Sequence, residues 1–106
     1  METRNLRESR RFAAEKMVKA GLFATARIYY DLYCLEPGQA QKVHSHGGSD
    51  KVYLVVEGRA TVIVGDEERE LGPDEAALAP AGQPHGVKNA GAERAVLLVV
   101  TTPPPA

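Results

Sequence analysis

Apolar residues alternate with polar ones, or form short apolar runs, over most of the chain from Leu22 onward. The first such stretch is LFATARIYYDLYCLEPG, which is rich in aromatic and β-branched residues. It ends at Pro37 and Gly38, a dipeptide that favours a turn. We therefore predict one long or two short β-strands between Leu22 and the turn.

Short apolar runs separated by Gly and Pro continue to the end of the chain. Glu57 and Gly58 separate the first two, and GDEE predicts a hairpin turn before the third. The predicted strands cover residues 51–56, 59–64, 69–72, 75–80, 85–87 and 95–102. Strands that recur about every ten residues, with no helical segment between them, predict an antiparallel sandwich or barrel.

The two ends of the chain differ from this pattern. The first twenty residues carry six Lys or Arg against three Glu, and Leu6, Ala13 and Met17 have helical spacing. We predict an N-terminal arm over residues 1–21, with its apolar residues packed on the barrel or on a neighbouring subunit. The barrel should occupy residues 22–102, and the Pro-rich residues 103–106 should form a disordered tail.

The composition narrows the class of protein. A chain of 106 residues with 43% hydrophobic and 25% charged residues is sufficient for one globular domain. A net charge of −1 gives no general attraction to nucleic acid or to anionic membranes. The single Cys34 excludes an intrachain disulfide and is expected to be a small buried residue, with a redox or substrate-binding role as the alternative. Without an apolar run long enough to span a bilayer or a signal-peptide core, we expect a cytoplasmic protein.

All three histidines of the chain lie in two short segments. His44 and His46 are two residues apart, so an extended backbone directs both imidazoles to the same face of a strand. His85 follows a Gly-Gln-Pro turn, and a barrel that places its strand beside the first could bring the three imidazoles together.

The residues around these histidines resemble the two conserved motifs of the cupin family. Gly38, five further residues, His44-Ser45-His46 and the closing Gly58 resemble the first motif. The second is matched by Pro80-x-Gly82-x-x-His85-x-x-x-Asn89. The two segments cover about half of the chain. The resemblance implies an all-β, antiparallel jelly-roll barrel in which His44, His46 and His85 hold a divalent transition metal, such as Fe, Zn, Ni or Mn. The alternative is a cupin that has lost its metal and keeps these histidines at the surface or hydrogen-bonded.

Two positions depart from the family pattern. Lys51 stands where the first motif has a Glu ligand, and Asp74 stands where the second has a Gly. An ammonium is repelled by a dication, so Lys51 should not ligate and should point away or pair with an acidic residue. Asp50 is one residue out of register and would face the site only if a bulge intervened. Asp74 tolerates turn conformations, so this change should be harmless.

Three neutral imidazoles leave the full +2 charge on the metal, which favours anionic ligands. Three-His iron sites occur in cupin thiol dioxygenases and diketone-cleaving dioxygenases, which this chain resembles in its ligand set. We therefore expect an oxygenase or isomerase acting on a small anionic chelating substrate, or else a non-catalytic binding or sensing module. Tyr53 shares the strand face of Lys51 and is the candidate catalytic residue, with a core aromatic as the alternative. Exposed strand edges and apolar strands further predict a homodimer.

Overall fold

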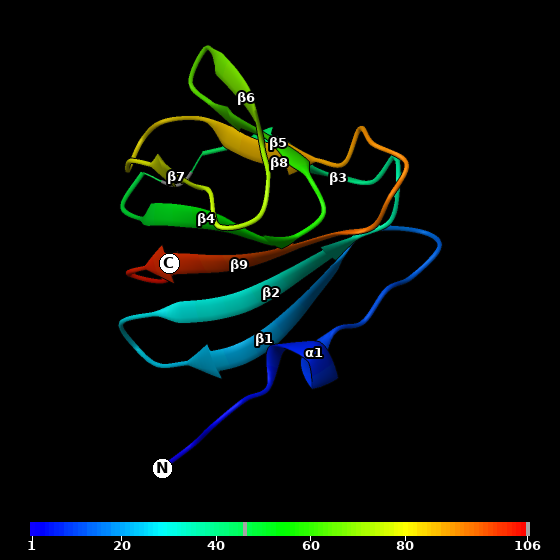
Figure 1. The fold of residues 1–106 in the computed structure, drawn as a ribbon. Coiled ribbons are helices and arrows are strands. Elements are labelled where there is room, and N and C mark those ends of the chain that lie inside the picture. The colour runs from blue at the N-terminus through cyan, green and yellow to red at the C-terminus, as the bar shows by residue number, and fades with distance from the viewer. Residues whose placement is uncertain (46, 106) are drawn as a thin grey trace.

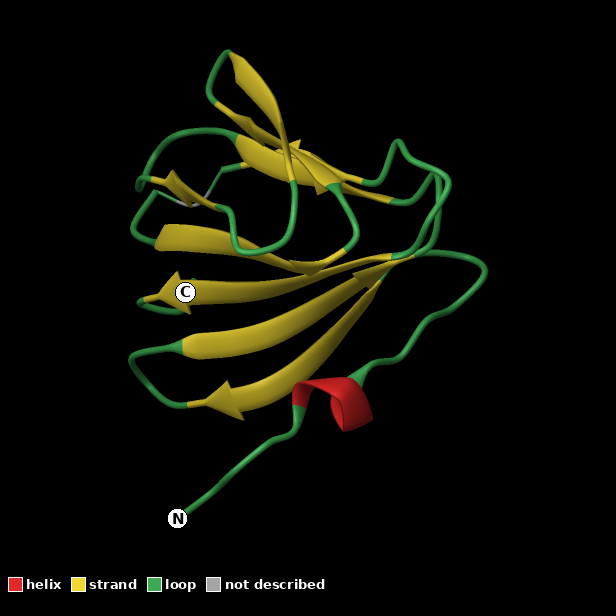
Figure 2. Ribbon diagram, viewed as in Figure 1, coloured by secondary structure: helices red, strands yellow, loops and turns green. Residues whose placement is uncertain are grey.

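A computed structural model describes residues 1–45 and 47–105, and nearly all its regular structure is β-strand (Figure 2). One short helix, α1 (Leu6–Ser9), precedes the strands. The strands are β1 (Val18–Ala24), β2 (Tyr29–Leu35), β3 (Ala40–His44), β4 (Asp50–Glu57), β5 (Ala60–Val64), β6 (Glu67–Leu71), β7 (Ala76–Ala79), β8 (His85–Lys88) and β9 (Ala95–Thr102). In the described ranges, no helix is long and apolar enough to cross a membrane.

The strands form two antiparallel sheets that face each other (Figure 1). One sheet has the order β1-β2-β9-β4-β7 and the other has the order β3-β8-β5-β6. Strands distant in the sequence are therefore neighbours. For example, β9 lies between β2 and β4 and pairs with both. This arrangement confirms the predicted all-β, antiparallel jelly-roll architecture.

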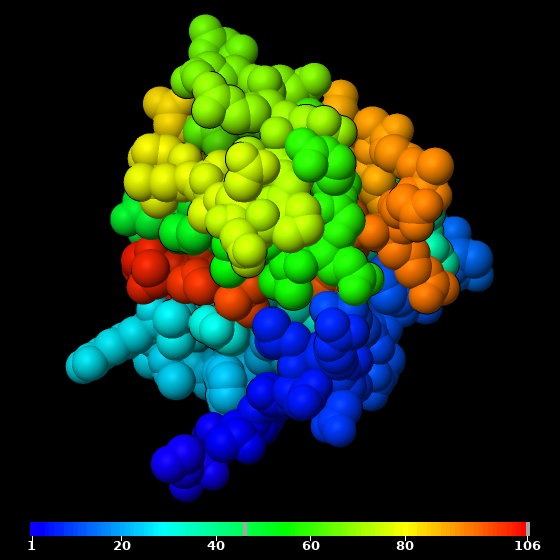
Figure 3. All heavy atoms as spheres, in the orientation of Figure 1, coloured from blue at the N-terminus to red at the C-terminus, as the bar shows by residue number. Residues whose placement is uncertain are grey.

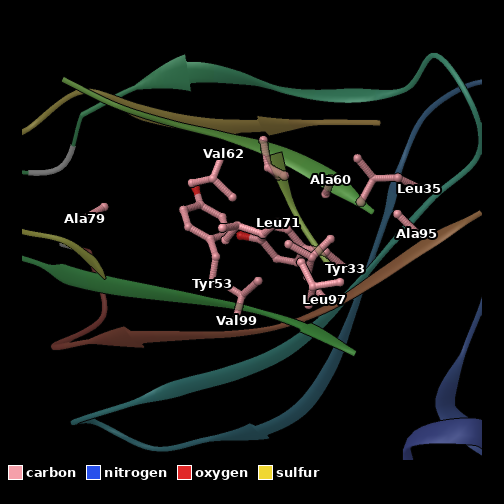
Figure 4. Close-up of a cluster of buried hydrophobic side chains, with 12 residues drawn as sticks. Tyr33, Leu35, Tyr53, Ala60, Val62, Leu71, Ala79, Ala95, Leu97 and Val99 are labelled. Atoms are coloured by element: carbon pink, nitrogen blue, oxygen red, sulfur yellow. The ribbon is translucent and has the colours of Figure 1, made fainter. Parts of the chain in front are cut away.

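The space between the sheets holds the main core, because the strands alternate apolar and polar faces. In β4, Lys51, Tyr53 and Val55 are buried, whereas Val52, between Lys51 and Tyr53, is exposed. Together with Tyr33 and other residues of both sheets, Tyr53 and Val55 form one apolar cluster (Figure 4). Burial of apolar surface of this kind is the main source of stability in a domain of this size.

A second, smaller cluster lies on the outer face of the five-stranded sheet. Its buried members are Leu22, Leu32, Cys34 and Val96, and residues of the N-terminal segment, including Leu6 and Phe12, pack against them. In the space-filling view the N-terminal residues lie against the neighbouring strands (Figure 3). The expected packing of the arm on the barrel is thus what the structure contains, although β1 already begins at Val18. Cys34 is buried, and burial raises the pKa of its thiol.

The residues after β9 contact the loop that precedes β4. The hydroxyl of Ser49 donates a hydrogen bond to the carbonyl oxygen of Pro103 at 2.6 Å. Pro104 and Pro105 are partly buried. Ala106 lies outside the described residues.

Three motif residues have clear structural roles. Gly58 has φ +76°, and a Cβ there would collide with the carbonyl of Arg94. Asp74 adopts φ 72°, which confirms that Asp can occupy this turn position in place of Gly. The amide of Asn89 donates to the carbonyls of Leu35 and Glu93, and so ties the β8–β9 loop to β2.

Candidate metal centre

His44 and His85 face each other across the antiparallel pair β3 and β8. They are register partners, and their ring centroids lie 4.5 Å apart. His85 is 1% exposed, whereas His44 is only half-buried. One imidazole therefore belongs to the interior of the barrel, and the other lies beside it nearer to solvent.

Both rings are oriented by the same kind of hydrogen bond. Nδ1 of His44 lies 2.8 Å from the carbonyl oxygen of Lys42, and Nδ1 of His85 lies 2.9 Å from that of Gln83. A carbonyl oxygen only accepts, so Nδ1 carries the proton in each ring. The lone pair of each neutral imidazole is then on Nε2, the arrangement that backbone partners impose on metal-ligating histidines.

A β-bulge and a glycine allow β3 to bring His44 opposite His85. The register of β3 and β8 shifts between Gln41 and His44, so both side chains reach the inner side although they are three residues apart. A Cβ on Gly86 would lie 2.8 Å from the carbonyl oxygen of Gln41 and 3.1 Å from Cα of Val43. Gly86 is therefore required for the close approach of the two strands.

The third predicted ligand, His46, lies outside the described residues. Among the residues that the structure describes, no three His, Cys, Asp or Glu side chains come together in a way that could hold a metal. His44 and His85 fit a divalent transition metal by their chemistry and by their tautomers. The three-His site remains a prediction.

Lys51 does not behave as expected. It points between the sheets rather than away from them, is 3% exposed, and donates to the hydroxyl oxygen of Tyr33 at 3.4 Å. The reason is the alternation of β4, which places Lys51 on the same face as Tyr53 and Val55. Burial, with a smaller contribution from Lys19 and opposed by Asp31, lowers the pKa of Lys51 to about 8.

Asp50 lies on the opposite face of β4, as its register predicts. Its side chain is exposed, and its carboxylate accepts a hydrogen bond from the backbone N–H of Ala81 at 2.8 Å. The register of β4 with β7 and β9 is continuous at this position. No bulge turns Asp50 inward, so the structure gives no support to Asp50 as a ligand.

Tyr53 lies close to both Lys51 and His85. Its ring centroid is 6.4 Å from that of His85 and 5.8 Å from Nζ of Lys51. Figure 4 shows Tyr53 and Tyr33 reaching from the five-stranded sheet into the interior. The hydroxyl of Tyr53 donates to Oε1 of Gln41 at 2.9 Å, and burial raises its pKa. The hydroxyl therefore keeps its proton, and a catalytic role for Tyr53 would be that of a hydrogen-bond donor.

Sequence reasoning missed Gln41 and Tyr33, which complete a chain of polar contacts inside the barrel. Nε2 of Gln41 donates to the hydroxyl of Tyr33 at 3.1 Å, which in turn accepts from Lys51. Tyr33 could have been identified because it lies two residues before Leu35 in an apolar strand and therefore shares its face. For Gln41 there was none, because strict alternation places it on the face opposite to His44.

Comparisons with known proteins agree with this architecture. A family model described as the cupin domain matches residues 31–101. The crystal structure of TT1209 from Thermus thermophilus is 56% identical and superposes with a TM-score of 0.97, covering 99% of this chain and all of that one.

Two further relatives have informative names. The tetracenomycin polyketide synthase protein TcmJ of Streptomyces glaucescens is 40% identical over 57 residues, which are 54% of this chain but only 38% of TcmJ. A sugar phosphate isomerase from Silicibacter pomeroyi is 28% identical, with a TM-score of 0.72 over 79% of this chain and 57% of that one.

Proposed function

Because this chain belongs to the cupin domain family, we propose that it is a metal-dependent enzyme in which His44, His46 and His85 hold one divalent transition metal inside the barrel. The reaction is an oxygenation or an isomerisation of a small anionic substrate that chelates the metal. The alternative is a non-catalytic module that binds or senses such a molecule in the same cavity.

The observation that carries the proposal is the paired orientation of His44 and His85. Each Nδ1–H is held by a backbone carbonyl, so the neutral form of each ring has its lone pair on Nε2. Such bonds fix the tautomer and increase the basicity of a ligating imidazole. Two histidines on adjacent strands with this arrangement, in a chain that places a third His two residues from the first, favour a metal site over a packing role.

A bound divalent metal would act as a Lewis acid or as the centre that binds oxygen. The residues of this chain supply the surroundings. The apolar walls formed by Val62, Val87 and their neighbours exclude water from the buried ring of His85. Tyr53 and Gln41 hold each other in place by their hydrogen bond, so their polar groups are directed before the substrate enters.

Of the two named relatives, one supports the isomerisation and neither names an oxygenation. A sugar phosphate isomerase shares the fold and 28% of the matched sequence, and a sugar phosphate is a small anionic molecule rich in oxygen ligands. The other named relative is a polyketide synthase protein. Neither name comes from a protein close enough to assign a substrate to this chain.

Metal content tests the site directly. We expect up to one transition-metal ion per chain by elemental analysis, and a sharp loss of metal in His44→Ala, His46→Ala and His85→Ala. Asp50→Ala is the matched control, since its carboxylate faces outward and should not affect the metal. Full occupancy in His85→Ala would refute the site, and loss in Asp50→Ala would identify a different ligand set.

Turnover distinguishes the enzyme from the binding module. Iron-loaded protein should be mixed anaerobically with a β-diketonate or a thiol carboxylate, and oxygen uptake and product measured when air is admitted. Zinc- and manganese-loaded protein should be tested for isomerisation of sugar phosphates. Activity that is lost in His44→Ala supports the enzyme, whereas tight binding with no turnover across both panels supports the binding module.

A further inference from the structure

Lys51 is a buried amine that has no charged partner in ion-pairing range among the described residues. None of the ion pairs that the described residues form includes it. Lys51 donates a long hydrogen bond, of 3.4 Å, to the hydroxyl oxygen of Tyr33. A buried ammonium is costly unless it is paired and hydrogen-bonded. A position that retains such a group in the interior of a barrel is therefore a candidate binding site.

A small cavity opens beside this amine on the inner face of the five-stranded sheet. Its volume is about 210 Å³, and its lining includes Lys19, Tyr29, Asp31, Tyr33, Lys51 and Thr101. This volume lies below the roughly 300–1,000 Å³ of pockets that hold drug-sized ligands. The cavity is therefore suited to a small molecule or to one end of a larger one.

The polar groups of the cavity are mainly hydrogen-bond donors. The ammonium groups of Lys19 and Lys51 lie 5.4 Å and 5.8 Å from the ring centroid of Tyr33. The oxygen of Tyr33 accepts from both Gln41 and Lys51, so its own proton is directed elsewhere. Burial raises the pKa of Tyr33 to about 12, so this proton is retained at neutral pH. Among the described residues that line the cavity, Asp31 supplies the one carboxylate against these donors.

We propose that Lys51, together with Lys19 and Tyr33, forms a subsite that binds the carboxylate of a small organic acid. The carboxylate supplies the negative charge that the buried ammonium lacks, and two or three charge-assisted hydrogen bonds hold it. One bound carboxylate also balances the net positive charge that the two lysines and Asp31 together give the cavity. The same Lys51 occupies the position at which related sites have an acidic metal ligand, so the replacement would convert a metal contact into a substrate contact.

The subsite and His85 both lie close to Tyr53. The Tyr53 ring centroid is 5.8 Å from Nζ of Lys51 and 6.4 Å from the ring of His85. An acid held at Lys51 could therefore extend along Tyr53 toward His85. That this acid is the substrate rests on the proposed function, but binding of the carboxylate requires no metal.

Binding should depend on pH through Lys51. The charged and titratable groups that face it are Lys19 on β1, Asp31 and Tyr33 on β2, and Tyr53 on its own strand. The pKa of Lys51 is about 8, and an anion binds the ammonium form. The association constant should therefore be steady at low pH and fall about tenfold per pH unit above the pKa of Lys51.

The test uses the whole 106-residue chain, stripped of metal and then freed of chelator. Acetate and benzoate are titrated by calorimetry between pH 6 and 10, with acetamide and benzamide as uncharged probes of the same shape. We expect both acids to bind and both amides to bind at least tenfold more weakly. Lys51→Met should weaken acid binding by about tenfold to a hundredfold and abolish its pH dependence, whereas Lys16→Met, an exposed control, should change neither.

A measurement on the wild-type protein guards against a folding defect in the variant. The pKa of the Lys51 amine, followed by NMR of labelled lysine, should rise by about one unit or more in saturating benzoate. An unchanged pKa, or equal acid binding by wild type and Lys51→Met, would overturn the subsite. Acid binding in protein that never takes up metal would leave the subsite standing while the proposed function fails, and metal binding without acid binding would do the reverse.

Discussion

Replacing Lys51 by methionine should make the protein more stable at neutral pH, although it removes a hydrogen bond. Burial lowers the pKa of Lys51 from 10.5 to about 8. One pKa unit corresponds to about 1.36 kcal/mol, so a fully dry site would make the protonated amine cost about 3 kcal/mol. The adjoining cavity leaves the amine some solvation, and we expect a gain in the free energy of unfolding of roughly 1–2 kcal/mol. Methionine matches the length of the lysine stem and adapts to irregular space.

The sign of the pH dependence separates this explanation from a simple packing effect. Between pH 8 and 10.5 the unfolded chain keeps a proton on Lys51 that the folded chain has lost. The wild-type contribution from this residue therefore rises with pH across that window, by at most about 1.4 kcal/mol per unit. The advantage of Lys51→Met should be full below pH 8 and should disappear by about pH 10.5.

Urea unfolding of metal-free wild type and variant, at intervals between pH 6 and 10.5, measures this difference. Because Tyr33 contacts Lys51 and tyrosines titrate in the unfolded chain near pH 10, the sign of the difference is judged from the data below that pH. Lys16→Met, at an exposed position, should show no difference at any pH. A variant that is less stable at pH 7, or an advantage that stays constant up to pH 10.5, would show that the ammonium is not destabilising. If the variant is more stable but no longer binds acids, Lys51 is a residue retained for function at the expense of stability.

Two further predictions concern the strand pair that carries the histidines and the outer face of the large sheet. Gly86→Ala should force β3 away from β8, because the new Cβ would meet the carbonyl oxygen of Gln41; we expect a loss of about 1–3 kcal/mol in urea unfolding and reduced metal content. Gly48→Ala, where nothing lies within 4 Å, should leave both unchanged, and equal behaviour of the two variants would contradict the argument. We also propose a homodimer through the outer face of β4 and β7, where the cross-strand partners Val52 and Leu78 are exposed, Leu78 by 58%. Light scattering at micromolar concentration should report twice the mass of one chain and, for Leu78→Lys, a single chain; a monomeric wild type would refute the dimer.

Much of the fold could be predicted because it depends on patterns within a few residues of each other. Alternation in β4 indicated that Lys51 and Tyr53 share a face and that Asp50 does not, and the structure agrees. The turn at Asp74 and the boundary between β4 and β5 at Gly58 follow from backbone conformations that few residues adopt. The order and spacing of the two motifs were sufficient to indicate the jelly roll.

Other features depended on neighbours that local patterns cannot identify. The bulge in β3 brings Gln41 to the inner side, and only the pairing with β8 shows it. The start of β1 at Val18 depends on pairing with β2, since Val18 lies opposite Cys34. The contact of Ser49 with Pro103 joins residues 54 positions apart. Each of these is a choice between partners rather than a preference of the segment itself.

The chemistry of the site shows the same division. The sequence determines which donors exist and which face of a strand carries them, since a period of two is a property of the extended backbone. It cannot determine that the amine of Lys51 is enclosed by Tyr33 and Tyr53 with Asp31 near but not bonded. Only the tertiary structure decides this, because the pKa of a buried group depends on how much water and which charges the packed strands of both sheets leave around it.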